Sequence, residues 1–198
     1  MNSVINKKDI LGQWKINNSW TLFLDRDGVI NQRKIGGYIT VVDEFEFLNG
    51  ALQALTLASK IFGKIIVVTN QQGIGKGLMT ESQLTQIHDY MVNKVTECNG
   101  RIDKIYHSPH MAESNHHLRK PNPGMAMKAA KDFPEISFKR SVMLGDSLSD
   151  MEFAQSVGMK AVFIGNPEEM GLISSLFDLD YASFFDFIKD LNSLDVIQ

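Results

Sequence analysis

The sequence predicts an α/β fold, a doubly wound and mostly parallel sheet in a three-layer sandwich, with little or no cap domain. Short apolar runs alternate with longer amphipathic segments along the chain. Asp, Thr and Asn follow several of the apolar runs, and stretches rich in Gly and Pro separate the segments. For 198 residues we expect one domain, residues 1–198, with a core over about residues 20–166. Residues 1–19 and about 179–198 are additions at its edges.

Apolar runs too short for typical helices predict the buried strands. They are rich in Val, Ile, Leu and Phe, and they cover residues 20–24, 65–68, 141–144 and 160–164. A weaker strand candidate covers residues 102–106.

Helical patterns occupy the segments between these runs, at residues 51–62, 81–97, 124–132 and 149–157. Thr80 and Ser149 are in position to act as N-caps. The C-terminal addition is predicted to be an amphipathic helix that closes the core, with a dimer contact as the alternative. Its apolar residues are Phe184, Phe185, Phe187, Ile188 and Leu191.

Composition and charge exclude several classes of protein. Hydrophobic residues make up 43% of the chain and the net charge is −3, which argues against disorder and against a broad cationic surface for nucleic acid or membrane. Cys98 is the single cysteine, so an internal disulfide and a thiolate zinc cage are excluded. Because residues 1–20 contain no secretory signal or membrane span, we expect a cytoplasmic protein, monomeric or homodimeric, that acts on a small molecule.

Polar side chains stand at the ends of the predicted strands. Asp25 and Asp27 follow the first strand, Thr69 and Asn70 follow the second, and Asp146 follows the strand over 141–144. Ligands of open parallel sheets bind beyond the carboxyl ends of the strands, so these residues are expected on one rim. Taken singly, each Asp could simply cap a helix. Two carboxylates about 5 Å apart repel by roughly 3 kcal/mol at an effective dielectric of about 20, so three together favour a divalent cation, with Mg²⁺ suited to oxygen ligands.

These residues resemble the motifs of the haloacid-dehalogenase-like phosphatases, and the resemblance runs from about residue 21 to residue 165. Residues 24–28 look like the family's first motif, residues 67–70 its second, Lys120 its third and residues 145–150 its fourth. Four motifs in the family's order are a specific signal, whereas Asp-x-Asp-Gly alone would be weak.

The resemblance implies a role for each motif residue. Asp25 would attack phosphorus and form an aspartyl-phosphate, while Asp27 would protonate the leaving oxygen and then activate water. Mg²⁺ would be held by Asp25, the main-chain carbonyl of Asp27 and Asp146, with Lys120 assisting. Further roles are implied for Thr69, which would hold the phosphate, and for Asp150, which would orient the fourth-motif loop or Lys120 rather than bind the metal.

At residues 25–31, 37–39, 69–74 and 119–125 the sequence also resembles one branch of this family, the heptose bisphosphate and histidinol phosphatases. They imply that Asn70, Tyr38 and Arg119 bind substrate, with the planar guanidinium of Arg119 suited to a second phosphate. The expected function is removal of the 7-phosphate of a D-glycero-D-manno-heptose 1,7-bisphosphate, a small phosphorylated sugar. Histidinol phosphate is the alternative substrate. A phosphoacceptor signalling domain is the alternative of another class, and Asp27 counts against it because a persistent acyl-phosphate has no use for an acid/base.

Two positions depart from the branch. Its members often carry a zinc loop of cysteines and histidine, but here His116 and Leu118 occupy the last two thiolate positions, and residues 107–110 replace the first pair. We therefore expect a loop without zinc, packed by its own residues, although a rearranged His site is conceivable. Ser147 stands where the heptose enzymes usually have Lys, so one cationic contact is missing.

Overall fold

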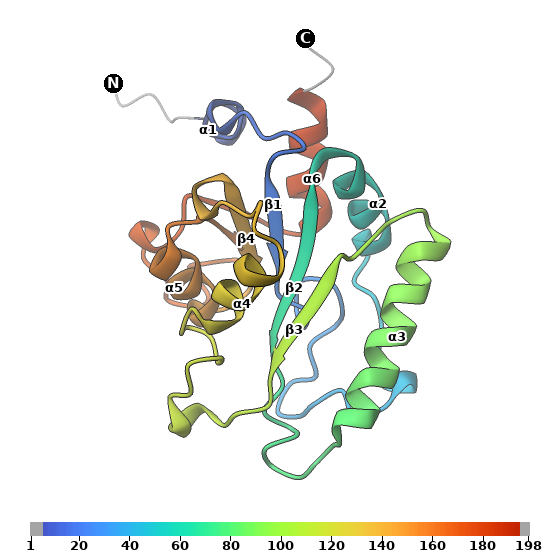
Figure 1. Ribbon diagram of the computed structural model, residues 1–198. Helices are drawn as coiled ribbons and strands as arrows, with labels where there is room; N and C mark the ends of the chain where they lie inside the picture. The colour runs from blue at the N-terminus through green and yellow to red at the C-terminus, as the bar shows by residue number, and fades with distance from the viewer. Residues whose placement is uncertain (1–5, 195–198) are drawn as a thin grey trace.

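A six-stranded parallel sheet forms the centre of the computed structural model, which describes residues 6–194. The strand order is β3-β2-β1-β4-β5-β6, and every neighbouring pair is parallel. The strands are β1 (Thr21–Leu24), β2 (Lys64–Asn70), β3 (Lys104–Ser108), β4 (Ser141–Gly145), β5 (Lys160–Ile164) and β6 (Leu179–Tyr181). Figure 1 shows β2 and β3 running downward in the view, so that their ends point away from α1.

Helices cover both faces of this sheet, which confirms the predicted three-layer α/β fold (Figure 1). The helices are α1 (Lys7–Trp14), α2 (Ala51–Ile61), α3 (Glu81–Glu97), α4 (Gly124–Asp132), α5 (Leu148–Val157) and α6 (Phe184–Leu194). Four short 3-10 turns lie at Val42–Glu44, Ala112–Ser114, Phe138–Arg140 and Ser174–Leu176. Of the helices within residues 6–194, none has the length and apolar character needed to cross a membrane.

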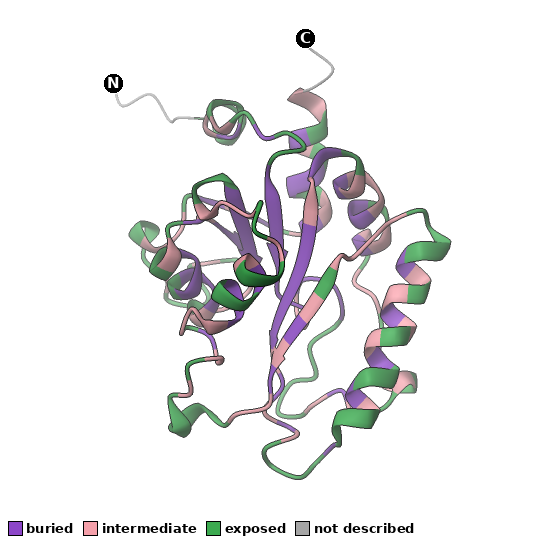
Figure 2. Ribbon diagram, in the orientation of Figure 1, coloured by how far each residue is buried: buried purple, intermediate pink, exposed green. Residues whose placement is uncertain are grey.

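Alternation along the strands divides the core into two layers. In β1, Leu22 and Leu24 pack with α1, α2, α3 and α6, whereas Phe23 points to the other face and packs with α4 and α5. Side chains alternate in the same way in the neighbouring strands, so both faces of the sheet are buried. Figure 2 shows the central strands as buried over most of their length. Such burial on both sides is why these strands read as continuous apolar runs.

The edges of the chain differ from the sequence prediction. Residues 179–181 form strand β6 instead of continuing a helix, and α6 begins at Phe184, where its apolar face packs against α2. Residues 195–198 of that predicted helix, and residues 1–5 of the N-terminal addition, lie outside the described residues. The N-terminal addition contributes helix α1, whose Leu11 is buried in the core.

The N-cap of α3 was predicted correctly, but that of α5 was not. Thr80 caps α3 in a reciprocal capping box with Gln83. Ser147, and not Ser149, caps α5, because the side chain of Asp150 at the third helical position accepts a hydrogen bond from the Ser147 backbone N–H. The helix therefore starts immediately after Asp146.

Candidate active site

Three adjacent strands bring the predicted site residues to one edge of the sheet. Strands β1, β2 and β4 are neighbours, and they end at Leu24, Asn70 and Gly145. The backbone N–H of Asp25 donates to the carbonyl of Leu144 at 2.9 Å, so the pairing of β1 with β4 extends through Asp25. The backbone of Asp25 is thereby fixed beside the turn that carries Asp146.

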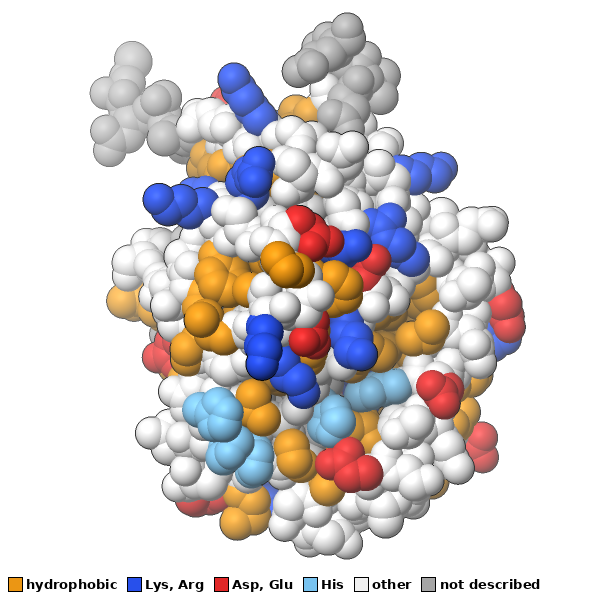
Figure 3. Space-filling model, in the orientation of Figure 1, with side chains coloured by type: hydrophobic (Ala, Val, Ile, Leu, Met, Phe, Trp, Pro, Cys, Tyr) orange, Lys and Arg blue, Asp and Glu red, His pale blue; other side chains and the backbone are white. Residues whose placement is uncertain are grey.

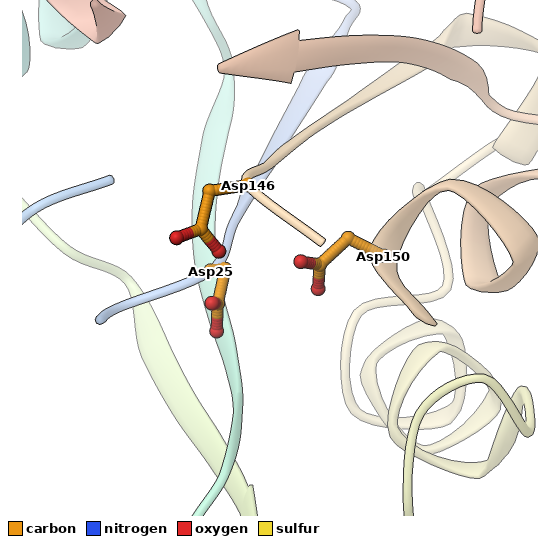
Figure 4. Close-up of side chains that lie close together, drawn as sticks. All are labelled: Asp25, Asp146 and Asp150. Atoms are coloured by element: carbon orange, nitrogen blue, oxygen red, sulfur yellow. The ribbon is translucent and has the colours of Figure 1, made fainter. Parts of the chain in front are cut away.

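Asp25, Asp146 and Asp150 form a carboxylate cluster. One oxygen from each side chain lies within 4.8 Å of the others, and Figure 4 shows the three carboxylates converging from the ends of β1 and β4 and from the first turn of α5. Over residues 6–194 no other group of three His, Cys, Asp or Glu side chains meets this criterion. Gly28 permits the close approach, because a Cβ at that position would lie 1.8 Å from Oδ2 of Asp146, and its φ is +95°.

Lys120 neutralises part of this cluster. Its Nζ donates to Asp25 Oδ1 at 2.8 Å, to Asp150 Oδ1 at 2.5 Å and to the carbonyl of Val68 at 2.8 Å. Burial acts to lower the pKa of Lys120, but the two carboxylates outweigh it and the pKa is raised, so the ammonium is charged. The side-chain amide of Asn70 holds the backbone of Lys120 through a donated and an accepted hydrogen bond of 3.1 and 3.0 Å.

Full ionisation of the cluster is unfavourable with Lys120 as its buried cation. Burial, followed by neighbouring carboxylates, raises the pKa of Asp25 to about 6. Burial and the charge of Asp25 raise the pKa of Asp146 to about 8, although Arg33 opposes this with a hydrogen bond to Asp146 Oδ1 at 2.5 Å. A divalent cation bound among these oxygens would stabilise the ionised form of the carboxylates. Carboxylate oxygens are hard ligands of the kind that Mg²⁺ prefers, so the residues fit the expected metal.

The side chain of Asp27 lies outside this cluster and is held by three donors. Its Oδ1 accepts from Arg26 and from Asn31, both at 2.9 Å, and its Oδ2 accepts from Gln71 at 2.8 Å. Burial acts to raise the pKa of Asp27, yet the Arg26 charge and these donors together hold it below the ordinary value. Asp27 is therefore ionised at neutral pH and has one fixed orientation.

A cavity of about 770 Å³ opens above these residues. Asp25, Asp27 and Lys120 line it, and so do the predicted substrate-binding residues, namely Tyr38, Thr69, Asn70 and Arg119. Asp146 lines a neighbouring cavity of about 410 Å³, and Arg33 lines both. The cavity wall also carries Lys34 and Lys76, so several cations surround the space outside the carboxylate cluster.

Histidines occupy the loop that replaces the family's zinc loop. The rings of His110 and His116 stack with centroids 3.3 Å apart, and His117 lies 4.4 Å from His116. Arg119 donates to the carbonyl of His110 at 2.9 Å, so this loop also supports Arg119. Figure 3 shows histidine side chains gathered on the lower part of the visible face, beyond the ends of the strands.

Several residues around Asp27 were not singled out in the sequence. Arg26 lies within the first motif, whereas Asn31 and Gln71 lie just beyond the first and second motifs, and the sequence did not show that all three donate to one carboxylate. Arg33 lies in a loop with no motif, and nothing in the sequence indicated its pairing with Asp146.

Comparison with known proteins agrees with the resemblance seen in the sequence. The family described as HAD-hydrolase-like matches residues 117–169. A D-glycero-alpha-D-manno-heptose-1,7-bisphosphate 7-phosphatase from Mycobacterium bovis is 37% identical over 166 residues, covering 81% of this chain and 87% of the relative. A D-glycero-beta-D-manno-heptose-1,7-bisphosphate 7-phosphatase from Escherichia coli strain K12 is 36% identical over 150 residues, covering 71% of this chain and 77% of the relative.

A solved structure supports the same family assignment. The D,D-heptose 1,7-bisphosphate phosphatase from B. bronchiseptica, complexed with magnesium and phosphate, has a TM-score of 0.80 and 27% identity, covering 88% of this chain and 99% of its own. The four motifs, the fold and these relatives agree, and the chain belongs to the haloacid-dehalogenase-like phosphatases, in the branch of the heptose bisphosphate phosphatases.

Proposed function

We propose that this phosphatase removes the 7-phosphate of a D-glycero-D-manno-heptose 1,7-bisphosphate with Mg²⁺ as its cofactor, through a phosphorylated Asp25. The observation that carries the proposal is the carboxylate cluster with Lys120 at the base of a cavity lined by cations, in a chain 37% identical to a 7-phosphatase of this kind. The Mycobacterium bovis relative acts on the alpha anomer and the Escherichia coli relative on the beta anomer, as their names state.

In the first step a carboxylate oxygen of Asp25 forms a bond to phosphorus while the bond from phosphorus to the sugar oxygen breaks. Lys120 holds Oδ1 of Asp25 at 2.8 Å, which orients the carboxylate for an in-line approach. Asp25, the main-chain carbonyl of Asp27 and Asp146 would hold Mg²⁺, which supplies charge stabilisation for the phosphoryl oxygens. Thr69, whose side chain is buried and lines the cavity, would position the phosphate.

Asp27 moves the protons. Its carboxylic acid form gives a proton to the leaving sugar oxygen, and the carboxylate then takes a proton from water as that water attacks phosphorus. The bond from phosphorus to Asp25 breaks, and inorganic phosphate is released. Since Asp27 is ionised in the free protein, its proton must be taken up as a phosphate dianion approaches, because a nearby anion raises the pKa of a carboxyl.

A bisphosphate suits the charges around the cavity. Lys120 is committed to the carboxylate cluster, whereas Arg119 lines the cavity wall and is anchored by its bond to the His110 carbonyl. We propose that Arg119 binds the phosphate that is not hydrolysed. Tyr38, whose hydroxyl accepts from Gln72 at 2.9 Å, and Asn70 would face the sugar from the same wall.

A substrate panel tests the proposal. Release of inorganic phosphate is measured with Mg²⁺ for both anomers of heptose 1,7-bisphosphate, for heptose 7-phosphate, for histidinol phosphate and for p-nitrophenyl phosphate, with a chelator control. The highest kcat/KM is expected for a bisphosphate. In Arg119→Ala, KM for the bisphosphate should rise about tenfold with less change for monophosphates, because one charge-assisted contact is lost. Equal losses on both substrate types would refute the role of Arg119, and a stable phosphoprotein without turnover would indicate a signalling domain.

A further inference from the structure

Arg26 is the most deeply buried cation in the neighbourhood of the site. Its side chain is 1% exposed, and its Nη2 donates to Asp27 Oδ1 at 2.9 Å. A buried guanidinium needs acceptors for its donors, since an unpaired charged donor carries a large desolvation cost. Among the described residues, its Nε has no hydrogen-bond partner, so the orientation of the group depends on its two terminal nitrogens.

His88 supplies the acceptor for the second terminal nitrogen. It lies on the third turn of α3, half-buried, and its Nε2 is 3.2 Å from Nη1 of Arg26. Arginine has no acceptor atom, so the hydrogen bond requires an unprotonated Nε2 and places the ring proton on Nδ1. Figure 1 shows that α3 begins near the ends of β2 and β3, so its N-terminal half lies on the side of the molecule that carries the site.

The surroundings of His88 favour this neutral form. Burial, then the charge of Arg26 and then that of His107, lowers the pKa of His88 to about 3, and Asp27 opposes this only weakly. His107, at the end of β3, faces the His88 ring edge-on at 6.2 Å and is itself paired with Glu81 at 2.9 Å. His88 can therefore accept a hydrogen bond throughout the pH range in which phosphatases are assayed.

We propose that His88 is a positioning residue that fixes the Arg26 guanidinium, and through it the orientation of Asp27. The inference deepens the proposed function, since it rests on Asp27 as the acid/base. Asp27 must reach the leaving oxygen of the substrate, and small displacements of such a group cost about 10²-fold in rate in well-oriented reactions. Among the described residues the side chain of His88 is hydrogen-bonded to Arg26 and not to Asp27, and His88 does not line the cavity.

Three variants test this role through kcat and KM on the bisphosphate. His88→Leu removes the acceptor, and kcat is expected to fall about tenfold with KM within about twofold of the unsubstituted protein, because binding groups are untouched. His88→Gln places an amide oxygen near Arg26 and is expected to restore kcat to within about threefold. His107→Leu, which disturbs the same edge-on pair without touching Arg26, is the matched control and should change kcat less than about twofold.

Two NMR measurements test the inference without turnover. The ¹⁵N shifts of the His88 ring should show a proton on Nδ1 and none on Nε2. The terminal N–H groups of Arg26 should rotate slowly in the unsubstituted protein and in His88→Gln, and faster in His88→Leu. An Nε2–H tautomer, unchanged Arg26 rotation in His88→Leu, or an equal kcat loss in His88→Leu and His88→Gln would overturn the proposal. Absence of phosphatase activity in the unsubstituted protein would refute the proposed function instead, and the NMR results would still decide the contact with Arg26.

Discussion

Asp25 and Asp27 belong to one short turn, yet their surroundings shift the pKa of the two carboxyls in opposite directions. Asp25 lies among other carboxylates with Lys120 as its cationic neighbour, and burial raises its pKa to about 6. Asp27 points the other way, toward Arg26, Asn31 and Gln71, which hold its pKa low. Although only one residue separates them in the sequence, Asp25 lies in a cluster of carboxylates, whereas Asp27 is surrounded by hydrogen-bond donors. The opposite pKa directions support the separate roles proposed for the two carboxylates, since environment and not residue type sets the protonation state.

The largest expected effect tests the Asp25 side of this comparison. Asp25→Asn removes the nucleophile, and kcat should fall by at least about 10³-fold on every phosphate ester. The amide fits the same space and relieves repulsion within the cluster, so Tm should not decrease. Phosphate release and thermal unfolding check both points, with Asp89→Asn on the exposed face of α3 as the matched control. Appreciable turnover in Asp25→Asn would contradict the assignment.

The next effect concerns Asp27. Asp27→Asn should lower kcat by about 10²-fold, because the amide cannot transfer a proton. With p-nitrophenyl phosphate, whose leaving group needs little protonation, the first step should survive, so a burst of p-nitrophenolate and a phosphorylated protein are expected. Tm should decrease in this variant, since an amide NH₂ would face donors from Arg26, Asn31 or Gln71. If Asp27→Asn gave no burst, or if its Tm equalled that of Asp25→Asn, the two carboxylates would not have the different roles proposed for them.

The smallest expected effect is a pH dependence of stability without metal. Asp25 and Asp146 have pKa values of about 6 and about 8 in the fold, above the ordinary 3.8. Between about pH 4 and pH 8 the fold thus holds protons that the unfolded chain has released, and the free energy of unfolding falls as pH rises. Asp27, whose pKa is lowered in the fold, adds a stabilisation that is already complete above the ordinary pKa of 3.8 and stays constant in this range. His88, whose pKa falls from the ordinary 6.5 to about 3, opposes the trend only below about pH 6.5, where the unfolded chain binds a proton that the fold does not.

Thermal unfolding in the presence of chelator measures this dependence. Tm should drop by at least about 3 °C from about pH 5.5 to about pH 8. Asp146→Asn is the control, and its Tm should vary less because it lacks the group with the higher pKa. Added Mg²⁺ should raise Tm most at the higher pH, because the ligands must be deprotonated to bind it. A Tm that rises with pH equally in both proteins would show that the cluster does not carry the predicted charge.

The sequence predicted the parts of the site that depend on strand ends. Asp25, Thr69 and Asp146 follow apolar runs, and parallel strands necessarily bring such residues to one edge. The fold class followed from the same alternation of runs. Strand β6 was missed because Leu179–Tyr181 is only three residues long and adjoins an amphipathic helix whose periodicity dominates the window.

Contacts between distant side chains could not be predicted in this way. Arg26 pairs with its neighbour Asp27 and also with His88, which lies 62 residues away on a helix, and no spacing rule connects Arg26 with His88. The N-cap of α5 shows a local form of the same limit. Ser147 and Ser149 have equal intrinsic preference for that position, and the choice is made by Asp150, which reaches back to residue 147 while also binding Lys120.

The double engagement of Asp150 links the mechanics of a helix to the chemistry of the cavity. One oxygen secures the first turn of α5 and the other secures the ammonium of Lys120. Fraying of that turn would therefore remove one of the three acceptors of Lys120, so the helix end and the lysine stabilise each other. A replacement at position 150 that served only as a good helix cap would leave the helix intact but remove one acceptor of Lys120, and we expect activity to fall while the fold is kept.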